Sequence, residues 1–263
     1  FSTVNNQLFN TDINLLSSLI ISSRNGDISF VGKILANFNK ADRNNPIAQN
    51  LTILATSGSV TINNNIGIQS QTTGSSIPLN HALGDLDITA KNIYILADIL
   101  TAFTQTYSGS VWIGDNGQVG ALYNSYIAYQ ANTFIPALFN SNPIYARTII
   151  SADPSITVNG QINDMEKNTH TLFMAVISYP DETSPSLIEV KDKIGDIASL
   201  YSLGMSSVKL VNTVTNDYHY HGTLSVPTLV HTYSDQNYSG AAINITTTGI
   251  VPEPTNAEFI VDL

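Results

Sequence analysis

Apolar residues recur along this chain in a spaced triplet, with apolar side chains at positions i, i+2 and i+6. The starts of six copies, at residues 28, 60, 93, 156, 188 and 208, are separated by 32, 33, 63, 32 and 20 residues. A repeat near 32 residues is typical of stacked architectures, in which each unit packs against its neighbours. The copies are Ile28/Phe30/Ile34, Val60/Ile62/Ile66, Ile93/Ile95/Ile99, Ile156/Val158/Ile162, Ile188/Val190/Ile194 and Val208/Leu210/Val214.

Within a copy, apolar and polar residues alternate with a period of two. Ile28 and Phe30 are apolar, and Ser29 between them is polar. This alternation, together with many Ile, Val, Thr and Tyr residues, predicts half-buried β-strands rather than helices. Three segments align over sixteen residues, and a fourth from Leu86 fits with a turn two residues shorter. The three are LIISSRNGDISFVGKI from Leu19, LTILATSGSVTINNNI from Leu51 and RTIISADPSITVNGQI from Arg147.

A second pattern lies on top of the short repeat. The Tyr-x-Gly motifs at Tyr107 and Tyr238 are 131 residues apart, and the Ile-Gly pairs at Ile66 and Ile194 are 128 apart. These similar distances predict that residues 50–116 and 172–246 are two versions of one longer block.

The repeat order predicts one elongated domain over residues 1–263. Repeats fill residues 17–246, residues 1–16 are a candidate N-terminal cap, and residues 247–263 are a C-terminal cap or tail. The open ends of stacked strands need such covers. In the least repeat-like stretch, residues 120–146, the spacing of Tyr123 and Tyr126 predicts a short helix.

The order of these segments resembles the repeat region of filamentous-haemagglutinin-type proteins, which are large bacterial surface exoproteins of the two-partner-secretion or autotransporter-passenger kind. LTILATSGSVTINNNIG, LGDLDITAKNIYILADILT, TQTYSGSVWIGD and RTIISADPSITVNGQI carry the resemblance, which covers most of residues 15–250. It implies a right-handed parallel β-helix, a location outside the cell or on the bacterial surface, and a role in adhesion. A receptor or glycan on a host or neighbouring cell would then be the partner.

Composition narrows the possible partners. Charged residues make up 11% of the chain, and the formal net charge is −10. A chain without basic clusters is a poor ligand for nucleic acid or an anionic membrane. There is no long apolar run that predicts membrane insertion, no cysteine, and no motif that predicts a cofactor.

One constellation has the residue types of a metal site. In the segment 217–221, Asp217, His219 and His221 would share one face of a strand, and Tyr218 and Tyr220 the other. Two His residues and a carboxylate can bind Zn²⁺ or a similar ion. The alternative is an exposed polar face above a buried Tyr pair.

Two further groups could bind a ligand. Tyr123, Tyr126, Tyr129 and Phe134 form an aromatic-rich candidate binding surface, because exposed aromatic rings stack on sugars and anchor interfaces. The alternative is a lid packed over the core. Asp85, Asp87 and Asp98 could meet by stacking and bind Ca²⁺ or act as acids; the alternative is a solvated strand face.

Three functional hypotheses follow. The first is a non-enzymatic structural or adhesive element that presents loops on a rod. The second is an extracellular filament or sheath subunit that binds copies of itself end to end. The third is a β-helical carbohydrate-active enzyme that uses stacked acids such as Asp85 and Asp87.

Overall fold

The structure is a computed structural model that describes residues 1–38, 48–70, 79–122, 145–178, 185–212 and 217–246, with the backbone alone for 210–212 and 217–218. These residues form β-strands and one short 3-10 turn, η1 (Leu79–His81), so the predicted all-β class is confirmed. The strands are β1 (Ser2–Thr3), β2 (Gln7–Phe9), β3 (Ile13–Asn14), β4 (Leu19–Ser23), β5 (Ile28–Phe30), β6 (Ile34–Leu35), β7 (Leu51–Ile62), β8 (Leu86–Ile95), β9 (Ile99–Thr101), β10 (Gln105–Ile113), β11 (Ala146–Ser151), β12 (Ser155–Val158), β13 (Ile162–Asp164), β14 (Thr171–Ser178), β15 (Leu187–Val190), β16 (Ser202–Asn212), β17 (Asp217–Tyr220), β18 (Thr223–Pro227), β19 (Gln236–Ser239) and β20 (Ala242–Thr246).

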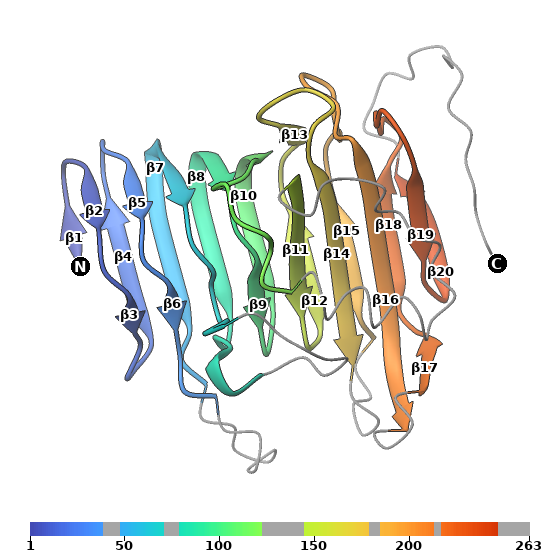
Figure 1. Cartoon of the computed structure of the whole chain (residues 1–263), viewed down its shortest axis with the longest axis horizontal. Helices are drawn as coiled ribbons and strands as arrows, with labels where there is room; N and C mark the ends of the chain where they lie inside the picture. The colour runs from blue at the N-terminus through green and yellow to red at the C-terminus, as the bar shows by residue number, and fades with distance from the viewer. Residues whose placement is uncertain (39–47, 71–78, 123–144, 179–184, 213–216, 247–263) are drawn as a thin grey trace.

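The strands form two long sheets and one short pair. The twelve-stranded sheet runs in the order β1-β4-β7-β8-β10-β12-β15-β18-β20, with β2, β5 and β13 attached to this path. The six-stranded sheet has the order β17-β16-β14-β11-β9, with β19 beside β16, and β3 pairs with β6. Among these described strands the pairing is parallel except between β16 and β17. The chain therefore advances from one end of the molecule to the other as it passes repeatedly through the sheets (Figure 1).

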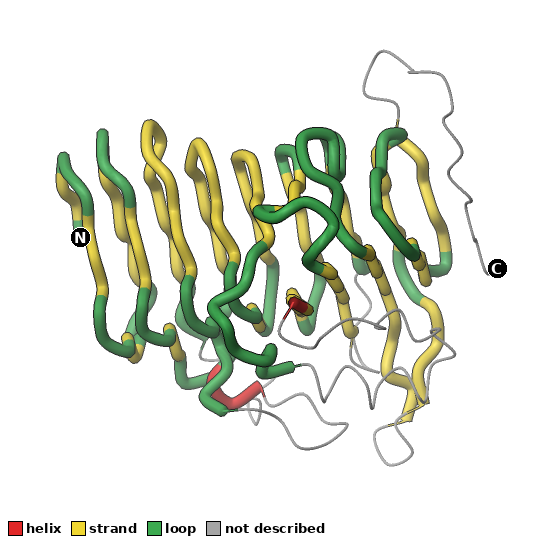
Figure 2. The backbone as a smooth tube through the Cα atoms, turned by 45° about the horizontal axis from the view of Figure 1, so that its top comes forward, coloured by secondary structure: helices red, strands yellow, loops and turns green. Residues whose placement is uncertain are grey.

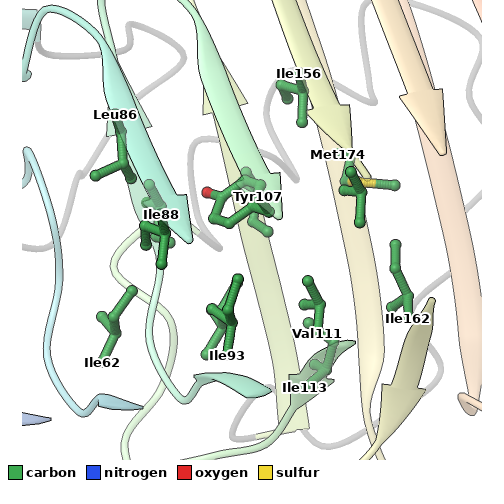
Figure 3. Close-up of a cluster of buried hydrophobic side chains, with 14 of the residues drawn as sticks. Ile62, Leu86, Ile88, Ile93, Tyr107, Val111, Ile113, Ile156, Ile162 and Met174 are labelled. Carbon is green, nitrogen blue, oxygen red and sulfur yellow. The ribbon is translucent and has the colours of Figure 1, made fainter. Parts of the chain in front are cut away.

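Each pass of the chain through the sheets, here called a rung, turns its apolar side chains inward. The backbone tube shows the rungs lying side by side, with bends between strands (Figure 2). Ile62, Ile93, Val111 and Ile162 lie in the main hydrophobic cluster, and each is at most 2% exposed. Figure 3 shows several of these side chains gathered between the strands. Parallel pairing places equivalent apolar residues above one another, which produces a continuous core.

The register confirms the first three triplets as equivalent. Ile28 pairs with Val60 and Val60 with Ile93, while Ile34, Ile66 and Ile99 are linked by isolated parallel bridges. The shorter turn in the copy from Leu86 is also confirmed. Ala55 of β7 pairs with Ala90 of β8, and the next pair is Ser59 with Asn92, so three residues of β7 but only one of β8 lie between the paired positions.

The predicted alignment of the fourth triplet with the first three is wrong. Ile156 pairs with Gln105, which in turn pairs with Leu86, so Ile156 belongs to a different column of the core. The residue stacked with Ile93, through Val111, is Ile162. The 63-residue interval between the third and fourth triplets contains β10, whose Val111 occupies the position equivalent to Ile93. Inward-facing residues occur on both sides of the turn within each rung. A triplet with the spacing i, i+2, i+6 can therefore begin on either side of that turn.

Two further alignments are also wrong. Arg147 lies in β11 of the six-stranded sheet, whereas Leu19 and Leu51 pair in the twelve-stranded sheet. Val208, from the sixth triplet, lies in β16 and packs in a separate cluster on the six-stranded sheet. Both segments are strands that contain apolar residues, and the apolar pattern alone does not specify which sheet a strand joins.

The proposed 131-residue repetition marks a repeated corner rather than a repeated block. Tyr107 lies in β10 of the twelve-stranded sheet, but Tyr238 lies in β19 of the six-stranded sheet. Each Tyr hydroxyl donates to the Gln two residues earlier, at 2.7 Å and 3.0 Å. The Gln amide in turn donates to a Thr hydroxyl four residues before it, and this Thr-Gln corner occurs at Thr3/Gln7, Thr101/Gln105 and Thr232/Gln236.

A second hydrophobic cluster covers the six-stranded sheet. It contains Leu100, Ile150 and Phe173 of the strands β9, β11 and β14. Residues from the connections between rungs, among them Phe38 and Leu122, pack on these side chains. The strand β14 is consequently buried along its whole length on both faces. The two sheets thus differ, because the six-stranded sheet has an additional layer of chain.

Gly67 and Gly117 provide a matched test of how tightly the rungs approach each other. Both have positive φ, at 75° and 76°, but a Cβ on Gly67 would collide with the Leu100 carbonyl oxygen, whereas a Cβ on Gly117 would meet nothing within 4 Å. We expect Gly117→Ala to cost about 1–2 kcal/mol from backbone conformation alone. Gly67→Ala should cost about 1–3 kcal/mol more, because the next rung must move. Urea unfolding of both variants measures the difference, and equal losses would contradict close inter-rung packing at Gly67.

Candidate functional site

Charged side chains from several rungs gather at one group of corners. Two of the segments involved are the turns that follow β10 and β13, and a third is the bend between β8 and β9. Four of the five residues are at most 2% exposed, and the side chain of the fifth, Asp115, is 24% exposed. We call this set the charge network, and its members are Asp98, Asp115, Arg147, Asp164 and His170.

His170 is held between two carboxylates. Its Nδ1 lies 2.5 Å from Asp164 Oδ1, and its Nε2 lies 2.9 Å from Asp115 Oδ2. Both ring nitrogens can donate only when the ring is an imidazolium ion. Burial disfavours that ion, but the hydrogen bonds and charges of Asp164 and Asp115 outweigh burial and raise the pKa of His170 above its ordinary value of 6.5. Tyr145 packs its ring edge-on against the imidazole, at 5.7 Å between centroids.

The Asp164 carboxylate also organises the turn that carries His170. Its oxygens accept the backbone N–H groups of Glu166, Thr169 and His170 at 2.8–2.9 Å. Burial alone would raise the pKa of Asp115, but the bonds from His170 and from the Gly117 N–H lower it. Asp115 and Asp164 are therefore both engaged with backbone and with His170, so the turns after β10 and β13 are joined through one side chain.

Asp98 binds the backbone on both sides of residues 123–144. Its Oδ2 accepts the N–H of Leu122 at 2.7 Å, and its Oδ1 accepts the N–H of Thr148 at 2.8 Å. These two donors lie on either side of residues 123–144. Burial raises the pKa of Asp98, although the charge of Arg147 and the two N–H groups oppose this. One carboxylate therefore fixes the backbone at both Leu122 and Thr148.

Arg147 is fully buried within the network. Its Nη1 donates to the Ala146 carbonyl at 2.6 Å, and Nε and Nη2 have no hydrogen-bond partner among the residues that the structure describes. Burial lowers the pKa of Arg147, while the negative charges of Asp98 and Asp115 act in the opposite direction. Three carboxylates against two cations leave no excess positive charge, so the network does not favour an anion at Arg147.

The network is suited to joining segments rather than to proton transfer. An imidazolium with both N–H groups bound to carboxylates has no free nitrogen to accept a proton. The lowered pKa of Asp115 keeps its carboxyl group ionised, which is the wrong state for a general acid. Within the described residues no group of three or more His, Cys, Asp or Glu side chains has an arrangement suited to a metal ion.

The predicted metal residues are described only in part. His219 is exposed on β17, and His221 follows the end of that strand, with its backbone N–H bonded to the Ser207 carbonyl at 2.9 Å. His221 Nε2 is buried and has no partner among the described residues. The side chain of Asp217 lies outside the described side chains. The metal site at Asp217, His219 and His221 therefore stays a prediction.

The predicted aromatic surface and acid group have different outcomes. Tyr123, Tyr126, Tyr129 and Phe134, with the predicted short helix, lie outside the described residues. Asp85 accepts hydrogen bonds from the Asn50 amide at 3.0 Å and the Thr104 N–H at 3.1 Å. Its neighbour Asp87 is exposed on β8, and both differ in surroundings from Asp98, which belongs to the charge network.

Sequence reasoning missed the charge network because its members are spread over 73 positions, from Asp98 to His170. His170 follows Asp164 by six residues, but this spacing matches no motif that would identify the two as partners. The available signal was Arg147, a charged residue at the head of the apolar strand segment ARTIIS. A buried arginine requires nearby acids, but only the stacking of rungs identifies which acids they are.

Comparison of the chain with protein-family models, curated proteins and solved structures found no match. In the part of the chain that the structure describes, no helix has the length and apolar character needed to cross a membrane. Functional inference therefore depends on the arrangement of this chain's own residues.

Replacement of Asp98 tests its anchoring role. Asp98→Asn removes the charge that faces Arg147 and replaces one acceptor oxygen with an amide donor, so one buried N–H loses its partner. We expect a loss of roughly 3 kcal/mol in unfolding free energy and faster proteolysis between residues 122 and 148. Asp87→Asn, on the exposed face of β8, is the control and should change neither quantity. Unchanged stability and proteolysis in Asp98→Asn would contradict the anchoring role.

The raised pKa of His170 predicts a pH dependence. Stability from a raised pKa is fully present below the unfolded-state value, near 6.5, and is lost as pH rises through the folded-state pKa. The melting temperature should therefore fall as pH rises above 6.5, and His170→Asn should lack this part of the fall. His219→Asn, at an exposed position, should keep the wild-type curve. Parallel curves for wild type and His170→Asn would show that His170 does not pair with Asp164 and Asp115.

Proposed function

We propose that this chain is a right-handed parallel β-helix that acts as a non-enzymatic structural or adhesive element of a secreted or surface-attached bacterial protein. Parallel pairing of successive rungs supports the β-helix, as does the shared inward-facing core of the twelve-stranded sheet. The right hand follows the preference of parallel crossover connections. The location and the adhesive role rest on the resemblance of the repeats to filamentous-haemagglutinin-type proteins.

The observation that carries the proposal is the common position of four residues, each of which adjoins a segment outside the described residues. Phe38, Leu79, Leu122 and Ile177 each lie next to or one residue from a segment outside the described residues. All four side chains belong to the cluster on the six-stranded sheet. The described residues that adjoin these four segments therefore all lie over one face. In repeat proteins, insertions grouped on one face commonly form the binding surface.

The charge network supports the same function. Asp98 accepts hydrogen bonds from the N–H groups of Leu122 and Thr148, which lie on either side of residues 123–144, the longest of these four segments. When the flanking backbone is held in this way, less conformational entropy remains to be lost on binding a partner. Residues 123–144 are therefore the best candidate for the adhesive segment, in agreement with the aromatic residues in its sequence.

A loop replacement tests this function. In one variant, a short Gly-Ser linker from Leu122 to Tyr145 replaces residues 123–144, and in a control variant the same linker replaces residues 213–216, which are not among the four segments that adjoin this cluster. Beads coated with each protein are incubated with a panel of bacterial and eukaryotic cells. We expect wild-type and control beads to adhere to at least one cell type, and the first variant to adhere at least tenfold less while it keeps the wild-type circular dichroism spectrum. Absence of wild-type adhesion, or equal adhesion by all three proteins, would contradict the proposal.

The first rung favours a second candidate, assembly of copies end to end. The strands β1, β2 and β3 each pair with one neighbour, β4, β5 and β6. Their other edges carry unpaired backbone groups, which are a template for further strands. Phe1 and Leu8 on this rung are 78% and 62% exposed. A head-to-tail contact between such an edge and the last rung of another copy would extend into a filament.

The filament candidate predicts concentration-dependent growth. Sedimentation velocity over a concentration series should show larger species, and Leu8→Lys should reduce them, because a charge at this edge opposes stacking. Ile197→Lys, at a residue that is 61% exposed away from the first rung, is the control. A single sedimenting species at every concentration would rule out the filament candidate and leave the adhesive one.

A further inference from the structure

Two aromatic side chains lie next to each other on the outer face of the twelve-stranded sheet. Tyr94 on β8 and Trp112 on β10 are direct partners in the parallel register. Both are half-buried, and their neighbours along the strands, such as Ile93 and Ile113, point into the core with no exposure. The strand spacing of about 4.8 Å places the two residues one rung apart. Together they form an aromatic pair at the end of an outward-facing row: Thr61 of β7 continues the row on one side, whereas on the other the row ends at the buried Asn163 of β13.

The indole of Trp112 is held in one orientation. Its Nε1 donates to Asn92 Oδ1 at 3.3 Å, and Asn92 lies on the adjacent strand, two residues before Tyr94. The donor that the ring would otherwise present to solvent is thereby used within the sheet. The ring is oriented before any ligand binds, so little side-chain entropy remains to be lost on binding.

Neutral hydrogen-bonding groups surround the pair. Thr61 is the register partner of Tyr94 on β7, while Ser59 on β7 and Ser110 on β10 flank Asn92. The Gln161 amide bonds the Ser110 hydroxyl at 3.4 Å. These hydroxyl and amide groups repeat at the strand spacing. The surface combines aromatic rings with uncharged donors and acceptors.

We propose that this face binds a neutral, extended polysaccharide across the strands. The C–H faces of sugar rings stack on aromatic side chains, and sugar hydroxyls bond to neutral amide and hydroxyl groups. The rise per sugar in an extended polysaccharide is close to the spacing between strands, so successive sugars meet successive rungs. This inference goes beyond the adhesive function proposed for residues 123–144, because it assigns a second binding site with its own class of ligand.

The charge distribution selects neutral chains over anionic ones. The chain has a formal net charge of −10, which repels polyanions over the range of the Debye length. Near the pair, the exposed Asp87 and Lys91 of β8 are of opposite sign, so they provide no basic patch. A row of side chains that crosses several strands also suits a polymer that lies along it better than a compact ligand, which requires a concave pocket.

Affinity electrophoresis in gels that contain a soluble polysaccharide tests the proposal on the full chain. The neutral probes are glucomannan and xyloglucan, and the anionic probe is polygalacturonate. We expect retardation by at least one neutral probe, at least a tenfold weaker apparent affinity in Trp112→Ala and Tyr94→Ala, and a smaller loss in Trp112→Phe, which keeps an aromatic ring. Tyr233→Ala, at a Tyr that is 69% exposed elsewhere, is the control and should bind as wild type does.

Fluorescence gives an independent readout, because Trp112 is the single tryptophan of the chain. Its emission should change with a saturable dependence on the neutral probe that retards the protein. Retardation by none of the probes, retardation by polygalacturonate alone, or wild-type binding by Trp112→Ala would each overturn the proposal. The variant with residues 123–144 replaced should still bind the polysaccharide. Failure of the adhesive role of residues 123–144 is thereby distinguished from failure of the site at Tyr94 and Trp112.

Discussion

Parallel hydrogen bonding between successive rungs is the constraint on which this structure depends. Each rung satisfies its backbone groups only through the rungs on either side, so a rung has no stable form alone. The pairing also sets the spacing of side chains, which brings Ile28, Val60 and Ile93 into one column of the core. The same spacing brings Tyr94 and Trp112 together on the outer face. Core and surface therefore follow from one register.

The bends between strands interrupt this pairing, and polar side chains replace the lost partners there. Asn6 accepts the N–H of Asp27 at 2.9 Å, and Asp27 accepts the N–H of Ser59, in the next rung, at 2.7 Å. The Thr-Gln corner does the same work with a hydroxyl and an amide. This use of side chains explains why a chain with 11% charged residues is nevertheless rich in Asn, Ser and Thr. Neutral groups can be buried at a bend at a lower desolvation cost than charges.

The charge network is the exception, and its position explains its composition. It lies beside Leu122 and Thr148, whose backbone N–H groups bond to a carboxylate rather than to a carbonyl of a neighbouring rung. Carboxylates accept several N–H groups at once, as Asp98 and Asp164 do. Arg147 and His170 then balance the buried negative charge. The two sheets thereby differ: the six-stranded one is covered by a second hydrophobic cluster, whereas the twelve-stranded one presents the half-exposed Tyr94 and Trp112 on its outer face.

The sequence by itself determined the all-β class, the inward and outward faces of the strands, the equivalence of the triplets at Ile28, Val60 and Ile93, and the shortened turn after Ala90. These properties depend on alternation and local turn length, which are written in consecutive residues. Tertiary structure alone decided that Ile162 rather than Ile156 stacks with Val111, that Tyr107 and Tyr238 belong to different sheets, and that Arg147 meets Asp98 and Asp115. The physical reason is that alternation has a period of two in every strand. It specifies which side chains face the core, but not which strand lies beside which.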